Sequence, residues 1–290
     1  MPEPTVFLGV DAGATRSRAR AVDAAGRALA EADAGPANLH LDRDGAFANL
    51  RGLVDATLER AGIGAAARGG VALGLGVAGL VGRGDAGAVA RAFLGFGRVE
   101  VAGDGVAALL GAHGGGDGGI LIFGTGAVAL GRVGGATFEI GGRGLDLGDD
   151  ASGAWIGREI LRAALRARDG LGPASALTRD ALAPFLGEPA RAVAFARDAS
   201  PGDFGRFAPK AFAAADAGDE VALDILGRAA REVAVYVAAL EARGVARIAF
   251  AGGVAEPLRR RLAADLALRL VAPAHDAVVG AILLAGGPAP

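Results

Sequence analysis

The chain has 290 residues and contains no cysteine. This absence excludes disulfide bonds, cysteine-ligated zinc sites, iron–sulfur clusters and thiol nucleophiles. It also favours a reducing compartment, and we expect a cytoplasmic protein. No basic region followed by an apolar run stands at the N-terminus, so no signal peptide is expected.

Lysine is almost as scarce, because Lys210 is the only one and the positive charge is otherwise arginine. A P-loop of the form G-x-x-x-x-G-K-[ST] is excluded, and no G-x-S-x-G motif of an α/β-hydrolase occurs. The net charge of −2 gives no indication of a nucleic-acid or membrane-surface partner. The uncharged runs at 69–82, 118–131 and 277–290 are shorter than the roughly 18 residues that span a bilayer, so we expect buried strands or core helices there.

Glycine, in contrast, is abundant: the 50 glycines are about 17% of the chain, more than twice the usual share. There is no G-X-Y period and there are only 12 prolines, so a collagen is excluded. Hydrophobic residues make up 52% and charged residues 21%, which predicts a folded chain with one large domain or two smaller ones. At this glycine content a single Gly-rich turn is weak evidence for a ligand site.

Short apolar segments occur twice in a similar order. One set of three strands is expected at 5–10, 16–22 and 27–33, and a second at 119–124, 127–133 and 136–140. In each set a small-residue turn follows the first strand, and placing Asp11 on Gly124 also places Gly13 on Gly126. We interpret this pattern as an internal duplication of a β-meander.

Helices and further strands fill the rest of the chain. Strands are expected at 70–77, 98–102 and 247–251, and helices at 44–62, 84–95, 105–112, 153–168, 174–186, 188–198, 204–217, 219–243, 255–270 and 276–286. The alternation predicts an α/β fold of two similar halves, the second enlarged by helices.

A formal G-x-G-x-x-G motif occurs at Gly74, Gly76 and Gly79, directly after an expected strand. It offers the hypothesis of a dinucleotide-binding oxidoreductase. However, Gly82 and Gly84 follow closely, so the helix that the motif requires is delayed, and the strand does not open a βαβ unit.

Two other glycine turns, Asp11–Arg16 and Gly124–Ala127, stand at equivalent places of the duplicated meanders, and Gly252-Gly253 ends a later strand. Such turns expose backbone N–H groups that can bind phosphate. The arrangement resembles the actin, hexokinase and Hsp70 superfamily, in which two related domains close on ATP and each contributes one hairpin to the phosphates.

Four motifs then follow one another along the chain in a characteristic order. They are Gly35-Pro36-Ala37-Asn38, Asp104 before Ala107–His113, Gly124-Thr125-Gly126, and Leu147–Gly157. In this order they resemble the N-acetylglucosamine kinase and bacterial glucosamine kinase family, over essentially the whole chain. That family is related to the activator ATPases of benzoyl-CoA reductase and 2-hydroxyacyl-CoA dehydratase. The dehydratase activators hold an iron–sulfur cluster, and another branch of sugar kinases and repressors carries a cysteine-rich zinc motif; a chain without cysteine can have neither.

The resemblance implies an α/β fold of two actin-like, ribonuclease H-like domains with a nucleotide cleft between them. Residues 1–112, completed by 276–290, would form the N-terminal domain, and 113–275 the C-terminal domain. The implied activity is an ATP-dependent sugar kinase that transfers the γ-phosphoryl group to the 6-hydroxyl of an amino sugar, N-acetylglucosamine or glucosamine. ATP and Mg²⁺ are the implied cofactors, and a homodimer without nucleic-acid or membrane partners is expected.

The resemblance also assigns roles to single residues. Asp104 would orient the attacking sugar hydroxyl and accept its proton, although it is alternatively a cap of the helix at 105–112. Asp11 would hold Mg²⁺ through water. The implied ATP-binding residues are Asp11, Gly13, Ala14, Thr15, Arg16, Gly124, Thr125, Gly126, Gly252 and Gly253. The implied sugar-binding residues are Asn38, Asp104, Gly142, Arg143 and Asp149.

Two of the implied sugar-binding residues have an ordinary structural role as their alternative. Asn38 is alternatively an ordinary loop residue after Pro36, a common use of asparagine. Asp149 is alternatively part of the negative charge that favours the start of the helix at 153–168.

Three positions depart from the family pattern. Ala127 replaces a serine and loses a hydroxyl donor, Arg143 replaces a tryptophan in the wall of the sugar pocket, and Asp150-Ala151 replaces Glu-Gly. These departures support a second hypothesis, a nucleotide-dependent activator or regulatory ATPase that phosphorylates no sugar.

Overall fold

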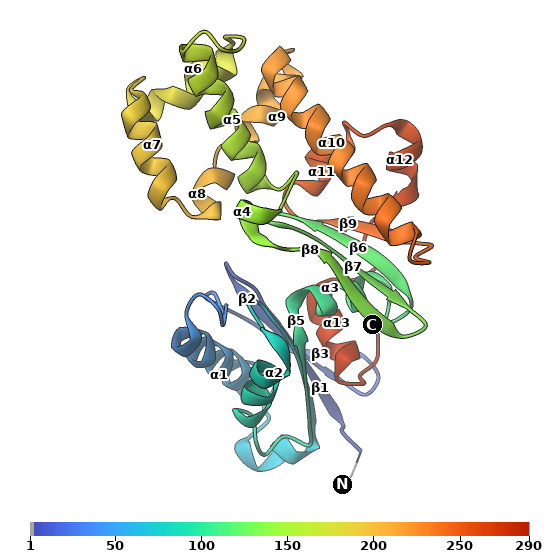
Figure 1. The fold of residues 1–290 in the computed structure, drawn as a ribbon. Coiled ribbons are helices and arrows are strands. Elements are labelled where there is room, and N and C mark those ends of the chain that lie inside the picture. Colours follow the sequence, from blue (N-terminus) through green and yellow to red (C-terminus); the bar gives the residue numbers. More distant parts are fainter. Residues whose placement is uncertain (1–2, 290) are drawn as a thin grey trace. The chain divides into compact units, whose positions relative to one another are not determined.

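The computed structural model describes residues 3–289, and the chain divides into two compact units (Figure 1). The first unit extends to Gly118 and also contains Arg132–Thr137 and the chain from Pro273 onward. The second unit comprises Gly119–Gly131 and Phe138–Ala272. The sequence predicts a slightly different division into domains, with 1–112 and 276–290 in one and 113–275 in the other. This division stays a prediction.

Each unit is built on a five-stranded sheet, and the two sheets have the same strand order. The first sheet has the order β3-β2-β1-β4-β5, and the second, read from its β8 edge, has the equivalent order β8-β7-β6-β9-β10. The strands are β1 Val6–Ala12, β2 Ser17–Asp23, β3 Ala28–Ala34, β4 Val71–Val77, β5 Arg98–Gly103, β6 Gly118–Phe123, β7 Ala127–Val133, β8 Ala136–Gly141, β9 Ile248–Ala251 and β10 Leu270–Val271. The repeated order confirms the predicted duplication and the α/β class.

The register of the parallel strands brings their carboxyl ends to one edge of each sheet. In the first sheet Ala12 of β1 lies beside Val77 of β4, and Val77 lies beside Gly103 of β5. In the second sheet β6 and β9 run parallel, with Ile122 beside Ala251. Ligands of open α/β sheets bind outside the carboxyl ends of the strands, so a ligand site is expected at each of these edges.

Helices cover both faces of the first sheet. They are α1 Arg43–Arg60, α2 Gly82–Arg91, α3 Asp104–Ala112 and α13 Ala277–Leu284, with a short 3₁₀ turn at Ala65–Gly70. Leu8 and Val10 of β1 belong to a core with Leu50 and Val54 of α1. Gly9, which alternates with them, packs on the opposite face, where any Cβ would overlap the backbone of α13.

Two of the three glycines of the formal dinucleotide motif are explained by this packing. A Cβ at Gly74 would overlap the Ala281 carbonyl of α13, and a Cβ at Gly76 would collide with the Ala107 side chain of α3. These two glycines therefore serve close contact between β4 and the helices α13 and α3.

Figure 1 shows helices α5 to α10 gathered on one side of the second sheet. The helices of this unit are α4 Gly144–Leu147, α5 Gly153–Arg168, α6 Ala176–Leu182, α7 Pro189–Asp198, α8 Pro201–Gly205, α9 Ala208–Asp216, α10 Glu220–Glu241, α11 Ala255–Arg259 and α12 Ala264–Arg269, with a 3₁₀ turn at Ala183–Phe185. Within residues 3–289 no helix is long and apolar enough to cross a membrane.

Two of the helices expected here are interrupted. The helix expected at 204–217 is two helices, because Pro209 begins α9 as a first-turn proline and the chain breaks at 206–207. The prediction of one continuous helix at 255–270 is also wrong. There the guanidinium of Arg259 donates hydrogen bonds to the carbonyls of Ala267 and Leu270, which folds the segment back so that β10 can pair with β9.

Candidate functional site

The turn after β1 is a hairpin whose tip is open to solvent. The Gly13 N–H donates to the Arg16 carbonyl at 3.1 Å and closes the turn, while Ala14, Thr15 and Arg16 are exposed. Asp11 lies just before the turn, and its Oδ2 accepts a hydrogen bond from Arg18 Nη2 at 3.0 Å. The predicted phosphate turn is thus a real hairpin with exposed backbone donors, next to a carboxylate that a neighbouring arginine neutralises.

The loop that carries Asn38 is joined to this hairpin. The Ala37 N–H donates to the Gly13 carbonyl at 3.0 Å, and the buried Ser17 hydroxyl donates to the Gly35 carbonyl at 2.9 Å. The Asn38 Oδ1 accepts hydrogen bonds from the backbone N–H groups of the two residues at 40 and 41, at 2.9 and 3.2 Å. Its carbonyl oxygen is therefore committed to the loop, and its Nδ2 is the group able to donate to a ligand.

Asp104 follows β5 directly and is the first residue of α3, whose N-cap is Gly103. Its Oδ1 accepts a hydrogen bond from the Gly105 N–H at 2.9 Å. The alternative of a helix cap is therefore wrong in its strict form, because the carboxylate lies inside the first helical turn. Since β1, β4 and β5 end in register, the first unit carries Asp104, the Asn38 loop and the hairpin after Asp11 at one edge of its sheet.

The turn after β6 is the second predicted phosphate hairpin. The Gly124 N–H donates to the Gly126 carbonyl at 2.9 Å, and Thr125 is exposed at the tip. The first N–H groups of α5 bond to this hairpin: Gly153 donates to the Gly124 carbonyl at 2.8 Å and Ala154 to the Thr125 carbonyl at 3.2 Å. These bonds fix the carbonyls of Gly124 and Thr125. Because Gly124 uses its N–H within the turn, the N–H groups of Thr125 and Gly126 are the candidate donors for an anion.

A cavity of about 580 Å³ opens beside the second hairpin. It is lined by the turns after β6 and β9 and by the starts of neighbouring helices: Gly124, Thr125, Gly153, Gly202, Gly205, Arg206, Ala208, Pro209, Phe212, Gly253, Val254 and Pro257. A Cβ at Gly124 or Gly253 would meet no protein atom within 4 Å, so both positions face open space. Gly252 differs, because its φ of +102° and the nearby Phe123 carbonyl require glycine for the backbone itself.

Sequence reasoning missed the far wall of this cavity, which Arg206, Pro209, Phe212 and Pro257 form. Arg206, Pro209 and Phe212 line the cavity from the break between α8 and α9, and Pro257 lines it from α11. The first-turn proline at 209 is the sequence signal that could have indicated this break.

Asp149 packs against the second hairpin and is 7% exposed. A Cβ at Gly126 would lie 2.8 Å from the Asp149 Oδ2, so the glycine makes room for the carboxylate. Burial raises the pKa of Asp149 above its ordinary value, although N–H groups of Ala127 and Gly144 donate to it and oppose this shift. The structure thus places a buried carboxylate, not an exposed helix-end charge, against the predicted phosphate turn.

The backbone around Asp149 is strained. Asp149 has φ +56° and Ala151 has φ +67°, a region that residues other than glycine rarely adopt. Ala151 is buried and stands where the family pattern has glycine, which explains the preference for glycine there. Ala127, the position of the missing serine, is buried as well.

The remaining predicted sugar residues line the loop after β8. Gly142 has φ +66° and donates its N–H to the Ala127 carbonyl at 3.0 Å. Arg143 is largely exposed and pairs with Glu139 at 2.8 Å. Tyr236 of α10, the only tyrosine of the chain, packs on Gly141, where a Cβ would overlap its hydroxyl group. The sequence patterns did not predict this position of Tyr236. The only indication in the sequence is that the chain has a single tyrosine.

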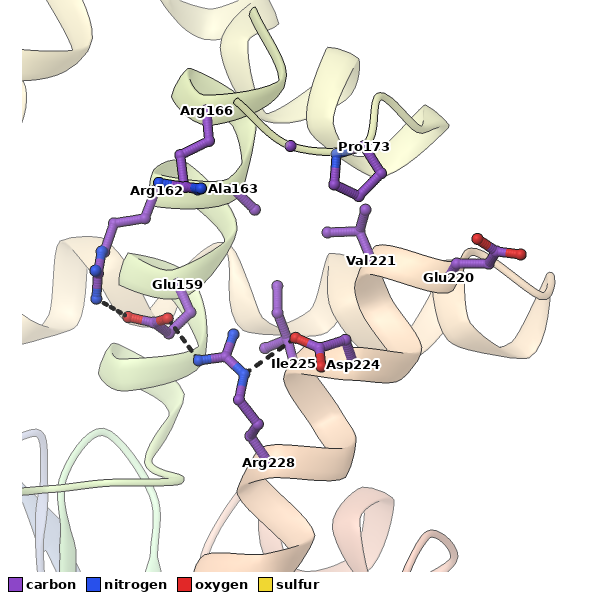
Figure 2. Close-up of a pocket in the computed structure, with 11 residues that line it drawn as sticks. Glu159, Arg162, Ala163, Arg166, Pro173, Glu220, Val221, Asp224, Ile225 and Arg228 are labelled. Atoms are coloured by element: carbon purple, nitrogen blue, oxygen red, sulfur yellow. Dashed lines mark hydrogen bonds and ion pairs between the residues drawn. The ribbon is translucent and has the colours of Figure 1, made fainter. Parts of the chain in front are cut away.

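A second cavity, of about 520 Å³, lies between α5 and α10 (Figure 2). The buried Glu159 faces it and pairs with Arg162 at 2.9 Å and with Arg228 at 2.8 Å. Arg228 also pairs with Asp224 at 3.1 Å and lies over the Trp155 ring, 5.2 Å from its centroid. These charges satisfy one another, so the cluster joins two helices and we assign it no ligand.

Comparisons with known proteins match the chain along most of its length. The model of the BadF/BadG/BcrA/BcrD ATPase family matches residues 8–285. A glucosamine kinase of Vibrio cholerae is 32% identical over 97% of this chain and 96% of its own. The crystal structure of a candidate N-acetylglucosamine kinase from Chromobacterium violaceum is 34% identical, covers 98% of this chain and 100% of its own, and superposes with a TM-score of 0.88. A glucokinase of the ROK family from Streptomyces griseus, crystallised with glucose and AMPPNP, is 22% identical over 96% of this chain and 98% of its own, with a TM-score of 0.56, and shares the fold.

Proposed function

Because the chain belongs to the BadF/BadG/BcrA/BcrD ATPase family, we propose that it is an ATP-dependent kinase that phosphorylates the 6-hydroxyl of an amino sugar, N-acetylglucosamine or glucosamine. The observation that carries this proposal is the edge of the first sheet. Asp104 begins α3 directly after β5, and the exposed hairpin tip at 13–16 follows β1 at the same edge. A homodimer and a cytoplasmic location stay predictions.

In this proposal Asp104 orients the sugar hydroxyl and accepts its proton as the phosphoryl group is transferred. Asn38 donates from its Nδ2 to a second hydroxyl, and Asp149 supplies an acceptor in the second unit. The exposed turns at 13–16 and 124–126 bind phosphate through backbone N–H groups, since no P-loop lysine exists. Gly253 and the cavity beside it accommodate the nucleoside, because its open face leaves room for a ligand.

Mg²⁺ fits this arrangement as an ion that arrives with the nucleotide. Among residues 3–289 no group of three or more His, Asp or Glu side chains could hold a metal by itself. Mg²⁺ commonly uses one or two carboxylates, waters and substrate phosphates, and Asp11 offers one such carboxylate beside the first hairpin. When bound, the ion would neutralise charge on the transferred phosphoryl group.

The test is ADP release measured with glucosamine, N-acetylglucosamine and glucose in parallel. We expect ADP release to depend on an amino sugar and to yield a sugar phosphate. Asp104→Asn should lower kcat by about 10²–10⁴-fold with unchanged thermal unfolding, because general base catalysis is lost while the Gly105 hydrogen bond can be kept.

Asp55→Asn, on the outer face of α1, is the matched control and should retain full activity. An Asp104→Asn enzyme with most of the wild-type kcat would refute the role of Asp104. ATP turnover that no sugar changes would favour the regulatory ATPase instead.

A further inference from the structure

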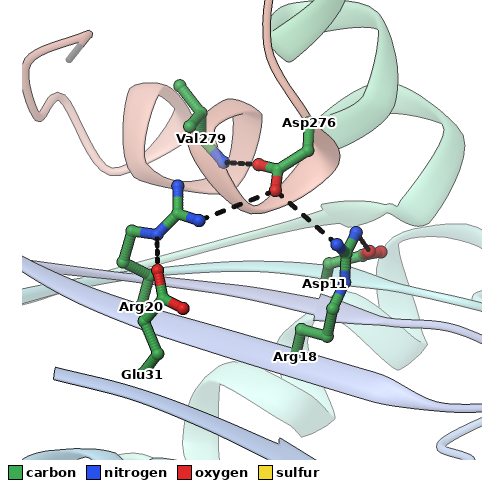
Figure 3. Close-up of polar contacts among 6 residues, drawn as sticks. All are labelled: Asp11, Arg18, Arg20, Glu31, Asp276 and Val279. Atoms are coloured by element: carbon green, nitrogen blue, oxygen red, sulfur yellow. Dashed lines mark hydrogen bonds and ion pairs between the residues drawn. The ribbon is translucent and has the colours of Figure 1, made fainter.

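Arg18 lies between two carboxylates in the first unit (Figure 3). Its Nη2 is 3.0 Å from the Asp11 Oδ2, and its Nη1 is 3.6 Å from the Asp276 Oδ2. Asp11 belongs to β1, whereas Asp276 is the N-cap of α13, where its Oδ1 accepts the Val279 N–H at 3.0 Å. One guanidinium therefore already contacts the proposed Mg²⁺ ligand and reaches toward an alternative partner.

We propose that Arg18 is a positioning residue that holds Asp11 in place and shifts to Asp276 when Mg²⁺ and nucleotide engage Asp11. The inference rests on the proposed function, because it takes Asp11 as the carboxylate next to the ion. Asp11 is half-buried, and its Oδ1 makes no hydrogen bond or ion pair within residues 3–289.

The geometry lets Arg18 exchange one carboxylate for the other with little movement. The two carboxylates lie on opposite sides of the same guanidinium, whose fork can contact both, so a small side-chain rotation changes the partner. Asp276 itself stays in place, because its Oδ1 accepts the Val279 N–H as the cap of α13. Arg18 thus stays charge-paired in both states.

The other charges around the guanidinium support the same conclusion. Arg20, two residues along β2, reaches the Asp276 Oδ2 at 3.8 Å and also pairs with Glu31. Arginine side chains stay protonated in proteins, so Arg18 is a cation that competes with Mg²⁺ for Asp11.

The competition predicts that two substitutions change the Mg²⁺ concentration needed for ADP binding in opposite directions. Asp276→Asn keeps the helix cap, since Asn and Asp are equivalent N-caps, but it removes the alternative charge for Arg18. Arg18 would then hold Asp11 more firmly, and the Mg²⁺ concentration for half-maximal ADP binding should rise about two- to fivefold, the range for a partly exposed ion pair. Arg18→Gln frees Asp11 and should lower that concentration by a similar factor.

The measurement is calorimetric ADP binding to the full chain at a series of Mg²⁺ concentrations, without sugar, so that no turnover contributes. The double variant Arg18→Gln with Asp276→Asn should behave as Arg18→Gln alone, because Asp276 acts only through Arg18. Arg20→Gln is the matched control: it also removes a cation from Asp276 but leaves Asp11 untouched, and it should not raise the Mg²⁺ requirement.

Thermal unfolding of every variant shows whether the fold is retained. An unchanged Mg²⁺ requirement in Asp276→Asn, or a raised one in Arg18→Gln, would overturn the role of Arg18 while leaving the kinase proposal intact. A wild-type chain that binds ADP equally with and without Mg²⁺ would also overturn the role of Arg18, whereas the kinase proposal is refuted only by the absence of sugar-dependent ADP release.

Discussion

Two buried carboxylates of the second unit, Asp149 and Glu159, have opposite surroundings. Asp149 is 7% exposed and Glu159 is 6% exposed. Glu159 pairs with Arg162 and Arg228, whereas Asp149 makes no ion pair within the described part of the chain and accepts only backbone N–H groups. Equal burial therefore does not mean an equal role.

The pKa values of the two groups move in opposite directions. Burial raises the pKa of Asp149, which has no cation to compensate. Burial would also raise the pKa of Glu159, but Arg228 and Arg162 outweigh it and lower that pKa below its ordinary value. An unpaired buried carboxylate in a strained loop, against a predicted phosphate turn, indicates function, and a paired one between helices indicates stability.

Among substitutions of these two carboxylates, the largest expected effect is on activity, from Asp149→Asn. We predict that kcat/KM for the amino sugar falls by about a hundredfold, because a charged acceptor in a water-poor site is lost. Stability at neutral pH should stay equal or rise, since the folded protein no longer buries an unpaired charge. Kinetics and thermal unfolding of the same preparation check both parts, and a substantial loss of stability would contradict the comparison.

The pH dependence of this variant has a definite sign. A raised pKa in the folded state means that the folded protein binds the proton more tightly than the unfolded chain. The stability that Asp149 contributes is therefore present at acidic pH and lost as pH rises through its folded pKa. Asp149→Asn should gain stability relative to wild type over that rise.

Glu159→Gln should show the reverse pattern. We expect unfolding to become easier by about 1–2 kcal/mol at neutral pH, less than for a fully buried pair because Arg162 and Arg228 are partly exposed. The lowered pKa means that this contribution is present at neutral pH and lost as pH falls through the folded pKa of Glu159. Denaturant unfolding across pH measures it, and kcat should not change; a variant that loses activity but not stability would reverse the assignment.

The smallest expected effect comes from the strained backbone at Ala151. Ala151→Gly should stabilise the protein by about 1 kcal/mol, since glycine adopts φ +67° without the Cβ penalty. Ala164→Gly in the middle of α5 is the control and should destabilise by about 1 kcal/mol or more. Equal effects of the two substitutions in denaturant unfolding would show that the loop carries no strain.

Much of the candidate site was predictable because it depends on local patterns. Apolar strands that end in small-residue turns placed the hairpins at 13–16 and 124–126, and Asp104 directly after a strand placed it at a sheet edge. The glycines at 74 and 76 show the limit of such patterns, because their motif indicated a nucleotide and their actual neighbours are helices α13 and α3.

Contacts between distant segments were not predictable from one sequence. Arg18 meets Asp276 at the other end of the chain, and Tyr236 reaches Gly141 from a helix that periodicity marked only as apolar. The break at 206–207 and the turn at 260–263 depend on a proline and on Arg259 hydrogen bonds that helical periodicity does not register.

The sequence by itself determined the duplicated α/β pattern, the exclusion of cysteine and P-loop chemistry, and the positions of the glycine turns. Each of these follows from composition or from neighbours along the chain. Only the tertiary structure decided which glycines face open space, which carboxylate is paired and which is not, and what partner Arg18 can reach. These depend on burial and on long-range contacts, and the free energy of a charge or a backbone angle is set by the atoms packed around it.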